Sequence, residues 1–314
     1  MEYLKEEEKE FKKILFTGLD TAGKTSIILT LQREFSKIAY IEPTRGAQRR
    51  IFKFLGKNIS EWDLGGQISY RISYLRNPGK HFDGTEIAIY VIDIRNLDRM
   101  FESISYLCDV VKQFKILKIN PSINIFFHKY DPILIKNAQN EMDGLIIELT
   151  KRIKDTINYK KLHFFKTSIY NLSTILSAMS EILLELYPKA KLIEKTVKQF
   201  AKKLNSDGLI VIDNNTLVVG AYCLNQETKN TLMKSIPLFM ALKDGLYGDI
   251  PSQPGDQIVV YRYGKYILFK QIMLEESIIP YYLLLIRKDN PWDLYFTNKD
   301  YDSFFKMMKT LFFK

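Results

Sequence analysis

A phosphate-binding loop is the clearest chemical signal in this 314-residue chain. Residues 18–25 read Gly-Leu-Asp-Thr-Ala-Gly-Lys-Thr and fit the pattern G-x-x-x-x-G-K-[S/T]. In such a loop the backbone N–H groups curl around a phosphate, Lys24 reaches the β and γ oxygens, and the Thr25 hydroxyl binds Mg²⁺. A glycine-rich turn is the simpler alternative, but the position between an apolar strand and a helix favours phosphate binding. The residues expected to bind the nucleotide here are Gly18, Asp20, Thr21, Ala22, Gly23, Lys24, Thr25 and Ser26.

A second group of polar residues follows the apolar segment 59–62 and reads Asp63-Leu-Gly-Gly-Gln67. A carboxylate at this strand end can hold Mg²⁺ through water, Gly66 lets a backbone N–H approach a γ-phosphate, and Gln67 can orient an attacking water. Alone, the same residues also fit a plain turn after a strand. Beside a phosphate loop they predict that Gln67 and Lys24 are catalytic.

Thr44 lies in a loop between the first expected helix and a hairpin. This loop can fold over the nucleotide, with the Thr44 hydroxyl on Mg²⁺ and its backbone N–H on the γ-phosphate. A lone threonine in a loop often has no such role. The expected Mg²⁺ site therefore comprises Thr25, Thr44 and, through water, Asp63.

The base is expected to bind at His128-Lys129-Tyr130-Asp131, directly after an apolar strand. The Asp131 carboxylate can accept hydrogen bonds from N1–H and the 2-amino group of guanine, whereas adenine would leave it unpaired. The Lys129 stem can lie along the base plane. After the next strand, Ser168 and Ile169 can offer backbone N–H groups to the base oxygen. These residues predict guanine selectivity.

The elements that must position these residues alternate between strands and helices. Several apolar runs are continuous, which is typical of a mostly parallel sheet covered by helices on both faces. An adjacent pair of runs with a short connection, 50–54 and 58–62, predicts an antiparallel hairpin. The expected strands are 13–17, 50–54, 58–62, 87–92, 123–127 and 162–165, and the later helices are 100–114, 139–155 and 172–186. The fold class is therefore α/β.

The pattern changes after Pro188, which predicts a second domain. We expect a charged N-terminal leader over 1–12, a nucleotide-binding domain over 13–188 and an α+β domain over 191–314. The last has the order α-β-β-α-β-β-β-α, with one antiparallel sheet. It shows no catalytic constellation, so we expect it to dimerise. An apolar helix face is available for that packing, although it can equally cover its own sheet: Leu232, Ile236, Phe239 and Met240.

Composition excludes several other classes of protein. The net charge of +10 is spread over both halves, which favours solvated surface over a nucleic-acid site. Two cysteines cannot build a disulfide framework, so a reducing interior is expected. The acidic N-terminus and Glu2 argue against a signal peptide or myristoyl anchor, and the longest apolar stretch, 278–286, is too short to span a membrane. We expect a cytoplasmic protein that reaches membranes only through partners.

With these motifs in place, the chain resembles the Ras-superfamily GTPases, and within them the Rag (Gtr) family with Arf-like features. Trp62-Asp-Leu-Gly-Gly-Gln67 looks like the W-D-x-G-G-Q that Arf and Rag proteins share, residues 18–25 are closer to Arf, and His128 replaces the usual Asn as in Rag proteins. The segment 165–170 and the second domain, which is similar to the roadblock-type domain of Rag proteins, strengthen the resemblance. Richness in Ile, Lys and Asn fits an AT-rich microbial source such as an archaeal relative.

This resemblance implies a switch that binds GTP or GDP with Mg²⁺ and hydrolyses GTP slowly. It implies a homodimer or heterodimer with a Rag-like GTPase through the second domain, roadblock- or longin-type scaffold proteins, and a GTPase-activating protein. No arginine is assigned as an internal finger, and five arginines are expected on the surface: Arg45, Arg49, Arg50, Arg71 and Arg76. The alternatives are a nucleotide-locked scaffold with little turnover and a metabolic ATPase, the latter disfavoured by Asp131.

Overall fold

The computed structural model describes residues 11–247, 257–262, 264–272, 280–289 and 298–313. The chain divides into two compact units, Met1–Ile175 and Leu176–Lys314. This division falls within helix α7 (Leu172–Leu184), ahead of the expected boundary at 188–191, which stays a prediction. The first strand begins at Phe11, two residues before the expected position, and most of the expected leader lies outside the described residues.

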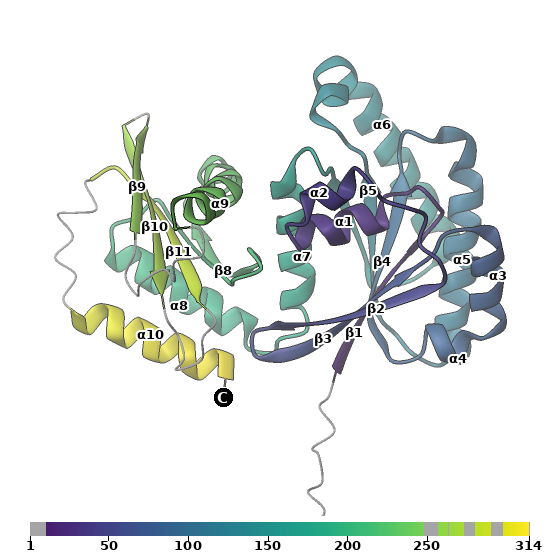
Figure 1. Ribbon diagram of the computed structural model, residues 1–314, viewed down its shortest axis with the longest axis horizontal. Coiled ribbons are helices and arrows are strands. Elements are labelled where there is room, and N and C mark those ends of the chain that lie inside the picture. Colours follow the sequence, from purple (N-terminus) through teal and green to yellow (C-terminus); the bar gives the residue numbers. More distant parts are fainter. Residues whose placement is uncertain (1–10, 248–256, 263, 273–279, 290–297, 314) are drawn as a thin grey trace, which may run out of the picture. The chain divides into compact units, whose positions relative to one another are not determined.

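The first unit is built on a six-stranded sheet with the order β2-β3-β1-β4-β5-β6. Strands β1, β3, β4, β5 and β6 run parallel, whereas β2 pairs antiparallel with β3, which confirms the expected hairpin. The sheet is drawn in Figure 1. Its strands are β1 (Phe11–Gly18), β2 (Ala47–Phe54), β3 (Lys57–Leu64), β4 (Thr85–Asp93), β5 (Ser122–His128) and β6 (Leu162–Thr167). The α/β fold class is confirmed.

The central strands are apolar at consecutive positions because both faces of the sheet are covered. Every residue of β5 is buried, and six consecutive residues of β4, from Ile87 to Ile92, are nearly inaccessible. One core cluster joins Leu15, Tyr90 and Phe127 to Leu107 and Val111 of α5. Helices α3 and α5 lie on one face of the sheet and α1 on the other (Figure 1). Continuous burial of this kind requires helices on both sides.

The helices of this part of the chain hold the functional loops between them and the strands. They are α1 (Lys24–Leu31), α2 (Phe35–Ile38), α3 (Ile68–Arg76), α4 (Pro78–His81), α5 (Met100–Ile116), α6 (Pro132–Ile157) and α7 (Leu172–Leu184), with a 3₁₀ turn η1 (Leu97–Arg99). Helix α6 is kinked at Ala138, which has non-helical backbone angles. Among the described helices, none is both long and apolar enough to cross a lipid bilayer.

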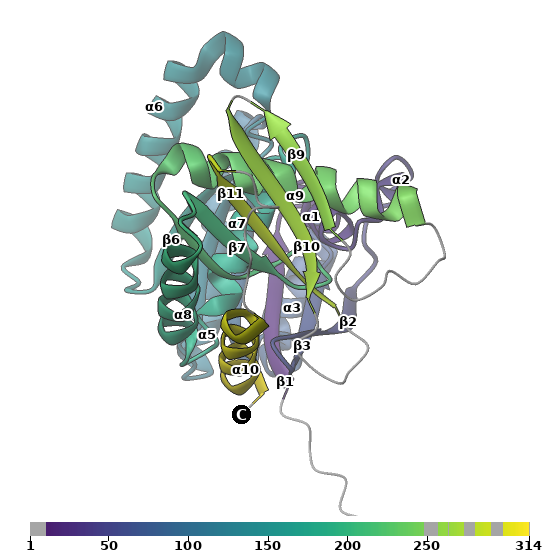
Figure 2. The same cartoon turned by 90° about the vertical axis from the view of Figure 1, so that its left-hand side faces the viewer.

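The second unit contains a five-stranded antiparallel sheet with the order β8-β7-β11-β10-β9. Its elements follow the expected order: α8 (Ala190–Lys203), β7 (Gly208–Ile212), β8 (Val218–Cys223), α9 (Gln226–Tyr247), β9 (Gln257–Arg262), β10 (Lys265–Ile272), β11 (Tyr281–Arg287) and α10 (Asn298–Phe313). Side chains alternate between the two faces of β11. Tyr281 packs on Phe312 of α10, and its neighbour Tyr282 packs on Phe269, which stacks on Phe239 of α9. Figure 2 shows α9 and α10 on opposite sides of this sheet.

The apolar face of α9 is not available for dimer packing, contrary to our expectation. Leu232 and Ile236 are fully buried, and Phe239 and Met240 are at most 3% exposed. These side chains cover their own sheet, as the Phe239–Phe269 ring centroid distance of 5.2 Å illustrates. The helical period alone could not separate the two alternatives, because both need the same apolar spacing.

Candidate functional site

The phosphate loop leaves β1 at Gly18 and enters α1 at Lys24, as expected. Gly23 caps the helix with a φ of 101°, a backbone conformation that glycine adopts without strain. The Lys24 ammonium is buried and donates to the Leu19 carbonyl at 2.8 Å and to the Gly18 carbonyl at 3.3 Å. Burial lowers the pKa of Lys24 to about 8, although the nearby Asp63 carboxylate opposes this shift. The loop thus holds its lysine close to the space that it encloses.

The three residues expected to bind Mg²⁺ meet at one end of this loop. The Thr25 hydroxyl lies 2.7 Å from Asp63 Oδ2 and 2.8 Å from the Thr44 hydroxyl, and Thr44 Oγ1 lies 3.3 Å from the same carboxylate oxygen. They come from α1, from the loop before β2 and from β3. Asp63 Oδ1 is buried and has no hydrogen-bond partner within the described part of the chain. Hard oxygen donors and an unsatisfied buried carboxylate oxygen fit Mg²⁺.

The end of β3 lies directly against the phosphate loop. A Cβ at Gly66 would collide with the backbone of Leu19 and Asp20, so only glycine allows this approach. The Gly65 N–H donates to the Gly46 carbonyl at 2.9 Å, which ties β3 to the loop that carries Thr44. Gln67 follows as the N-cap residue of α3 and is half-buried. The backbone therefore brings Gly66 to the loop and places Gln67 one residue beyond it.

His128 lies against Gly23, the last glycine of the phosphate loop. The buried imidazole packs against Gly23, where a Cβ would collide with the ring, and its Nδ1 lies 2.9 Å from Thr167 Oγ1. Burial lowers the pKa of His128 to about 4, and the charge of Lys129 adds to this effect. The imidazole is therefore neutral near pH 7 and connects β5, β6 and the loop.

The base-binding residues come together at the carboxyl ends of β5 and β6. Lys129 Nζ donates to the Thr21 carbonyl at 2.9 Å and lies 2.6 Å from Asp93 Oδ2. Ser168 Oγ donates to Asp131 Oδ1 at 2.6 Å, and Asp131 Oδ2 lies 3.6 Å from Arg95 Nη1. Ligands of open α/β sheets bind at this edge.

Ser168 contributes differently from our expectation for its backbone. Its N–H donates to Thr174 Oγ1 at 3.1 Å, so the hydroxyl, rather than the N–H, reaches into the base-binding group. Ile169, the other expected backbone donor, is half-buried next to it. A serine that orients Asp131 was not foreseen, because the two residues lie 37 positions apart.

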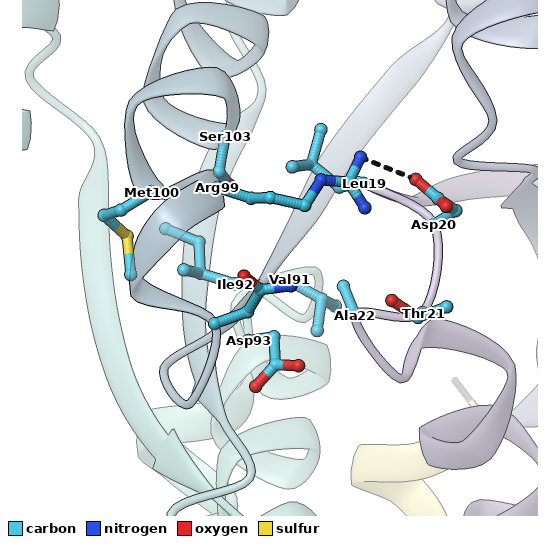
Figure 3. Close-up of a pocket in the computed structure, with 11 residues that line it drawn as sticks. Leu19, Asp20, Thr21, Ala22, Val91, Ile92, Asp93, Arg99, Met100 and Ser103 are labelled. Carbon is cyan, nitrogen blue, oxygen red and sulfur yellow. Dashed lines mark hydrogen bonds and ion pairs between the residues drawn. The ribbon is translucent and has the colours of Figure 1, made fainter.

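Two arginines beside the loop were missed or misplaced by sequence reasoning. Arg71 was expected on the surface but is buried, with its guanidinium paired with Glu102. Arg99 was not considered, yet its Nη2 lies 2.8 Å from Asp20 Oδ1, and its Nε lies 2.8 Å from Glu102 Oε2. Figure 3 shows Asp20 and Arg99 pointing toward each other across a pocket between the phosphate loop and the start of α5. The Arg99-x-x-Glu102 spacing was the only sequence signal for this cluster.

The chain is similar to several known proteins and matches one family profile. The family profile described as the Gtr1/RagA G protein conserved region matches residues 13–239. An ADP-ribosylation factor-like protein 3 from Chlamydomonas reinhardtii is 38% identical over 128 residues, which is 41% of this chain and 67% of that protein. Ras-related GTP-binding protein A from Dictyostelium discoideum is 26% identical over 212 residues, covering 66% of this chain and 68% of its own. The solved Arl6 BBS3 small GTPase from Trypanosoma brucei, with bound nucleotide analogue GppNp, is 16% identical with a TM-score of 0.41, over 55% of this chain and 96% of that one.

Proposed function

Because the chain belongs to the Gtr1/RagA family of G proteins, we propose that it is a guanine-nucleotide switch that binds GTP with Mg²⁺ and hydrolyses it slowly to GDP. Family membership supports GTP binding and hydrolysis in general. The specific assignments, namely the Mg²⁺ site, the base-selecting carboxylate and the slow rate, are our inference from the residues.

The observation that carries this proposal is the convergence of Thr25, Thr44 and Asp63. Three oxygen-bearing side chains from separate elements meet within hydrogen-bond distance at the phosphate loop, and one carboxylate oxygen remains buried and unpaired. Without a ligand this cluster destabilises the folded protein, since an unsatisfied buried polar atom costs about 1–3 kcal/mol in the free energy of folding. Bound Mg²⁺ would complete it and neutralise charge on the phosphates.

The remaining residues have separable roles in this proposal. The Lys24 ammonium turns from the loop carbonyls to the β and γ oxygens, and the Gly66 N–H reaches the γ-phosphate. Gln67 orients the attacking water. At the other end, Asp131 accepts from the guanine base while Ser168 fixes its orientation, and the Lys129 stem lies along the base plane. Neutral His128 supports the loop.

Hydrolysis is expected to be slow because carboxylates engage Arg99 and Arg71, the two arginines found beside Asp20 and the start of α3. Arg99 is held by Asp20 and Glu102, and Arg71 is buried against Glu102. Turnover is then on the order of 10⁻³ s⁻¹ or below, as for GTPases that lack an arginine in cis. A GTPase-activating protein would supply the missing cation.

A single-turnover assay tests the proposal. The protein is loaded with GTP or ATP in Mg²⁺, and phosphate release is followed with and without excess EDTA. We expect Mg²⁺-dependent release from GTP alone. Tight GTP binding without release would instead favour a nucleotide-locked scaffold, and release from ATP at a comparable rate would favour a metabolic ATPase.

We also propose that the C-terminal unit is a roadblock-type module that mediates assembly with a second Rag-like chain. The order α8-β7-β8-α9-β9-β10-β11-α10 supports this assignment. Among the described strands, β8 and β9 form the edges of the sheet, and Tyr261 on β9 is 62% exposed. Edge strands can pair with another chain. Scaffold proteins of the roadblock or longin type are further candidate partners, and a cytoplasmic location with membrane contact only through partners stays a prediction, as does an archaeal source.

Light scattering on the 314-residue chain tests this second proposal. We expect a mass of twice the 36.8 kDa chain, or a gain in mass when a second Rag-like chain is added. A strict monomer at high micromolar concentration in both experiments would contradict it.

A further inference from the structure

Four charged side chains form a continuous chain of ion pairs that nucleotide binding alone does not require. Asp20 pairs with Arg99, Arg99 pairs with Glu102, and Glu102 pairs with Arg71. The Asp20 Oδ1–Arg99 Nη2 and Arg99 Nε–Glu102 Oε2 distances are both 2.8 Å. The negative charges of the two carboxylates equal the positive charges of the two guanidinium groups, so this group of four side chains has no net charge.

One end of this chain lies in the phosphate loop. Asp20 occupies a loop that encloses anionic phosphates, where a free carboxylate would repel the ligand. Its side chain is directed instead to Arg99 at the start of α5 (Figure 3). Partial burial is the largest single influence and opposes ionisation of Asp20, but the hydrogen bond from Arg99 and the charges of Arg99 and Arg71 together lower the pKa of the carboxyl group. Arg99 thus neutralises the carboxylate and fixes its direction.

The other end lies in the first turn of the helix that Gln67 begins. The Arg71 N–H donates to the Gln67 carbonyl at 3.0 Å, and the Arg71 side chain is 8% exposed. Its guanidinium lies 5.0 Å from the centroid of the Tyr106 ring, and the Tyr106 hydroxyl lies 3.3 Å from Thr17 Oγ1 near the end of β1. Arg71 is therefore linked to the phosphate loop through Glu102 and Arg99, and to the strand before it through Tyr106.

This geometry differs from that of ordinary surface pairs. Isolated exposed ion pairs contribute little, because water screens them and two long side chains must be ordered. Here Arg71 is buried, so the loss of its partner would leave an uncompensated charge. The links are shared rather than separate, since Arg99 and Glu102 each bind two partners.

We propose that Asp20, Arg99, Glu102 and Arg71 are positioning residues that tie the phosphate loop to the first turn of α3 and so hold Gln67 in register with the phosphates. This inference rests on the proposed function, because it assigns a role in GTP hydrolysis. The alternative is that α3 is held only by its own packing, for example by buried Tyr74, and that the ion pairs are independent.

A double-mutant cycle between the two ends distinguishes these alternatives. Asp20→Asn and Arg71→Met remove the end charges, and the ion pairs that join these two residues run through Arg99 and Glu102. At saturating GTP, we expect each variant to slow single-turnover hydrolysis about 3- to 10-fold, with the double variant no slower than the slower single variant. Glu102→Gln, which changes the residue between Arg99 and Arg71, should slow hydrolysis to the same extent. It replaces Arg71→Met in the cycle if that variant does not fold. Asp109→Asn is the matched control, because it removes an exposed ion pair from the same helix.

Hydrogen–deuterium exchange at the amides of 68–76 gives a second readout that does not depend on turnover. With GTP bound, Asp20→Asn and Glu102→Gln should both increase exchange in α3, and Asp109→Asn should not. The inference would be overturned if the double variant slowed hydrolysis by the product of the two single effects. Unchanged hydrogen exchange in α3 in both Asp20→Asn and Glu102→Gln would also overturn it. Nucleotide binding by the unchanged protein is measured first. If the protein binds no GTP, both the proposed function and this inference are overturned. If it binds GTP normally but substitutions at Asp20 and Arg71 act independently, only the inference is overturned.

Discussion

The Thr25 hydroxyl donates a 2.7 Å hydrogen bond to Asp63 Oδ2, which joins the phosphate loop to the end of β3 across 38 sequence positions. The loop and the strand are neighbours because β1 and β3 pair in parallel, with Phe16 opposite Asp63. Their shared edge is where Thr44 also arrives. This contact therefore fixes the geometry of the proposed Mg²⁺ site.

Substitution of either partner should shift the effect of Mg²⁺ on nucleotide release to higher Mg²⁺ concentrations. Thr25→Val or Asp63→Asn takes away one oxygen donor or one charge, and we expect a loss of about 10- to 100-fold in metal affinity. The two changes should be far from additive, since the residues act on one site. The measurement is the dissociation rate of a fluorescent GTP analogue across a Mg²⁺ titration. Equal Mg²⁺ dependence in the variants and the unchanged protein would place the metal elsewhere.

Gly66→Ala should destabilise the protein because an added methyl group collides with the backbone of Leu19 and Asp20. Overpacking of this kind costs about 1–3 kcal/mol in the free energy of unfolding. Gly144→Ala is the control: nothing lies within 4 Å of a Cβ there, and the position is inside helix α6. That change should stabilise by up to about 1 kcal/mol. Urea unfolding of both variants checks the contrast, and equal effects would contradict the close approach.

The stability of the protein should fall in acid partly through His128. Its pKa is about 4 in the folded protein, below the ordinary 6.5, so protonation favours the unfolded chain. The neutral imidazole therefore contributes its full stabilisation above about pH 6.5, and this contribution is lost as the pH falls toward 4. The loss in the free energy of unfolding amounts to about 2 kcal/mol by pH 5.

The test compares the unfolding free energies of the unchanged protein and His128→Asn at pH 7.5 and pH 5. An amide does not titrate there, so the variant should lose about 2 kcal/mol less on acidification. Identical losses would mean that folding does not lower the pKa of His128.

Gln67→Leu should abolish hydrolysis while leaving GTP affinity unchanged, because Gln67 is expected only to orient water. Its half-buried position at the start of α3 allows the substitution without disturbing the core. Single-turnover kinetics and a binding titration on the same preparation separate the two effects. An unchanged hydrolysis rate would assign the water-orienting role to another residue.

The site could be predicted from the sequence wherever its chemistry is local. The phosphate loop and Asp131 follow apolar strands and Asp63 lies at the end of β3, and the carboxyl ends of parallel strands meet at one edge of a sheet. The order of elements in the second unit followed from apolar spacing and local turn residues.

Contacts between distant residues could not be predicted in this way. The Arg99–Asp20 pair spans 79 positions, and Arg71 was expected on the surface but lies in helix α3, an element that was not predicted from the sequence. Burial of Arg71 depends on Glu102 and Tyr106, which the fold supplies. The apolar face of α9 was a different problem, because its spacing fits both a dimer interface and its own core.

The most direct test of guanine recognition is a calorimetric titration of the unchanged protein and Asp131→Asn with GTP, ATP and xanthosine triphosphate in Mg²⁺. The unchanged protein should prefer GTP strongly over ATP, because Asp131 is oriented by Ser168 and accepts from N1–H and the 2-amino group. Asp131→Asn should weaken GTP by about 3 kcal/mol and strengthen xanthosine triphosphate, since its amide can donate to the additional oxo group. Comparable affinities of the unchanged protein for GTP and ATP would contradict the account.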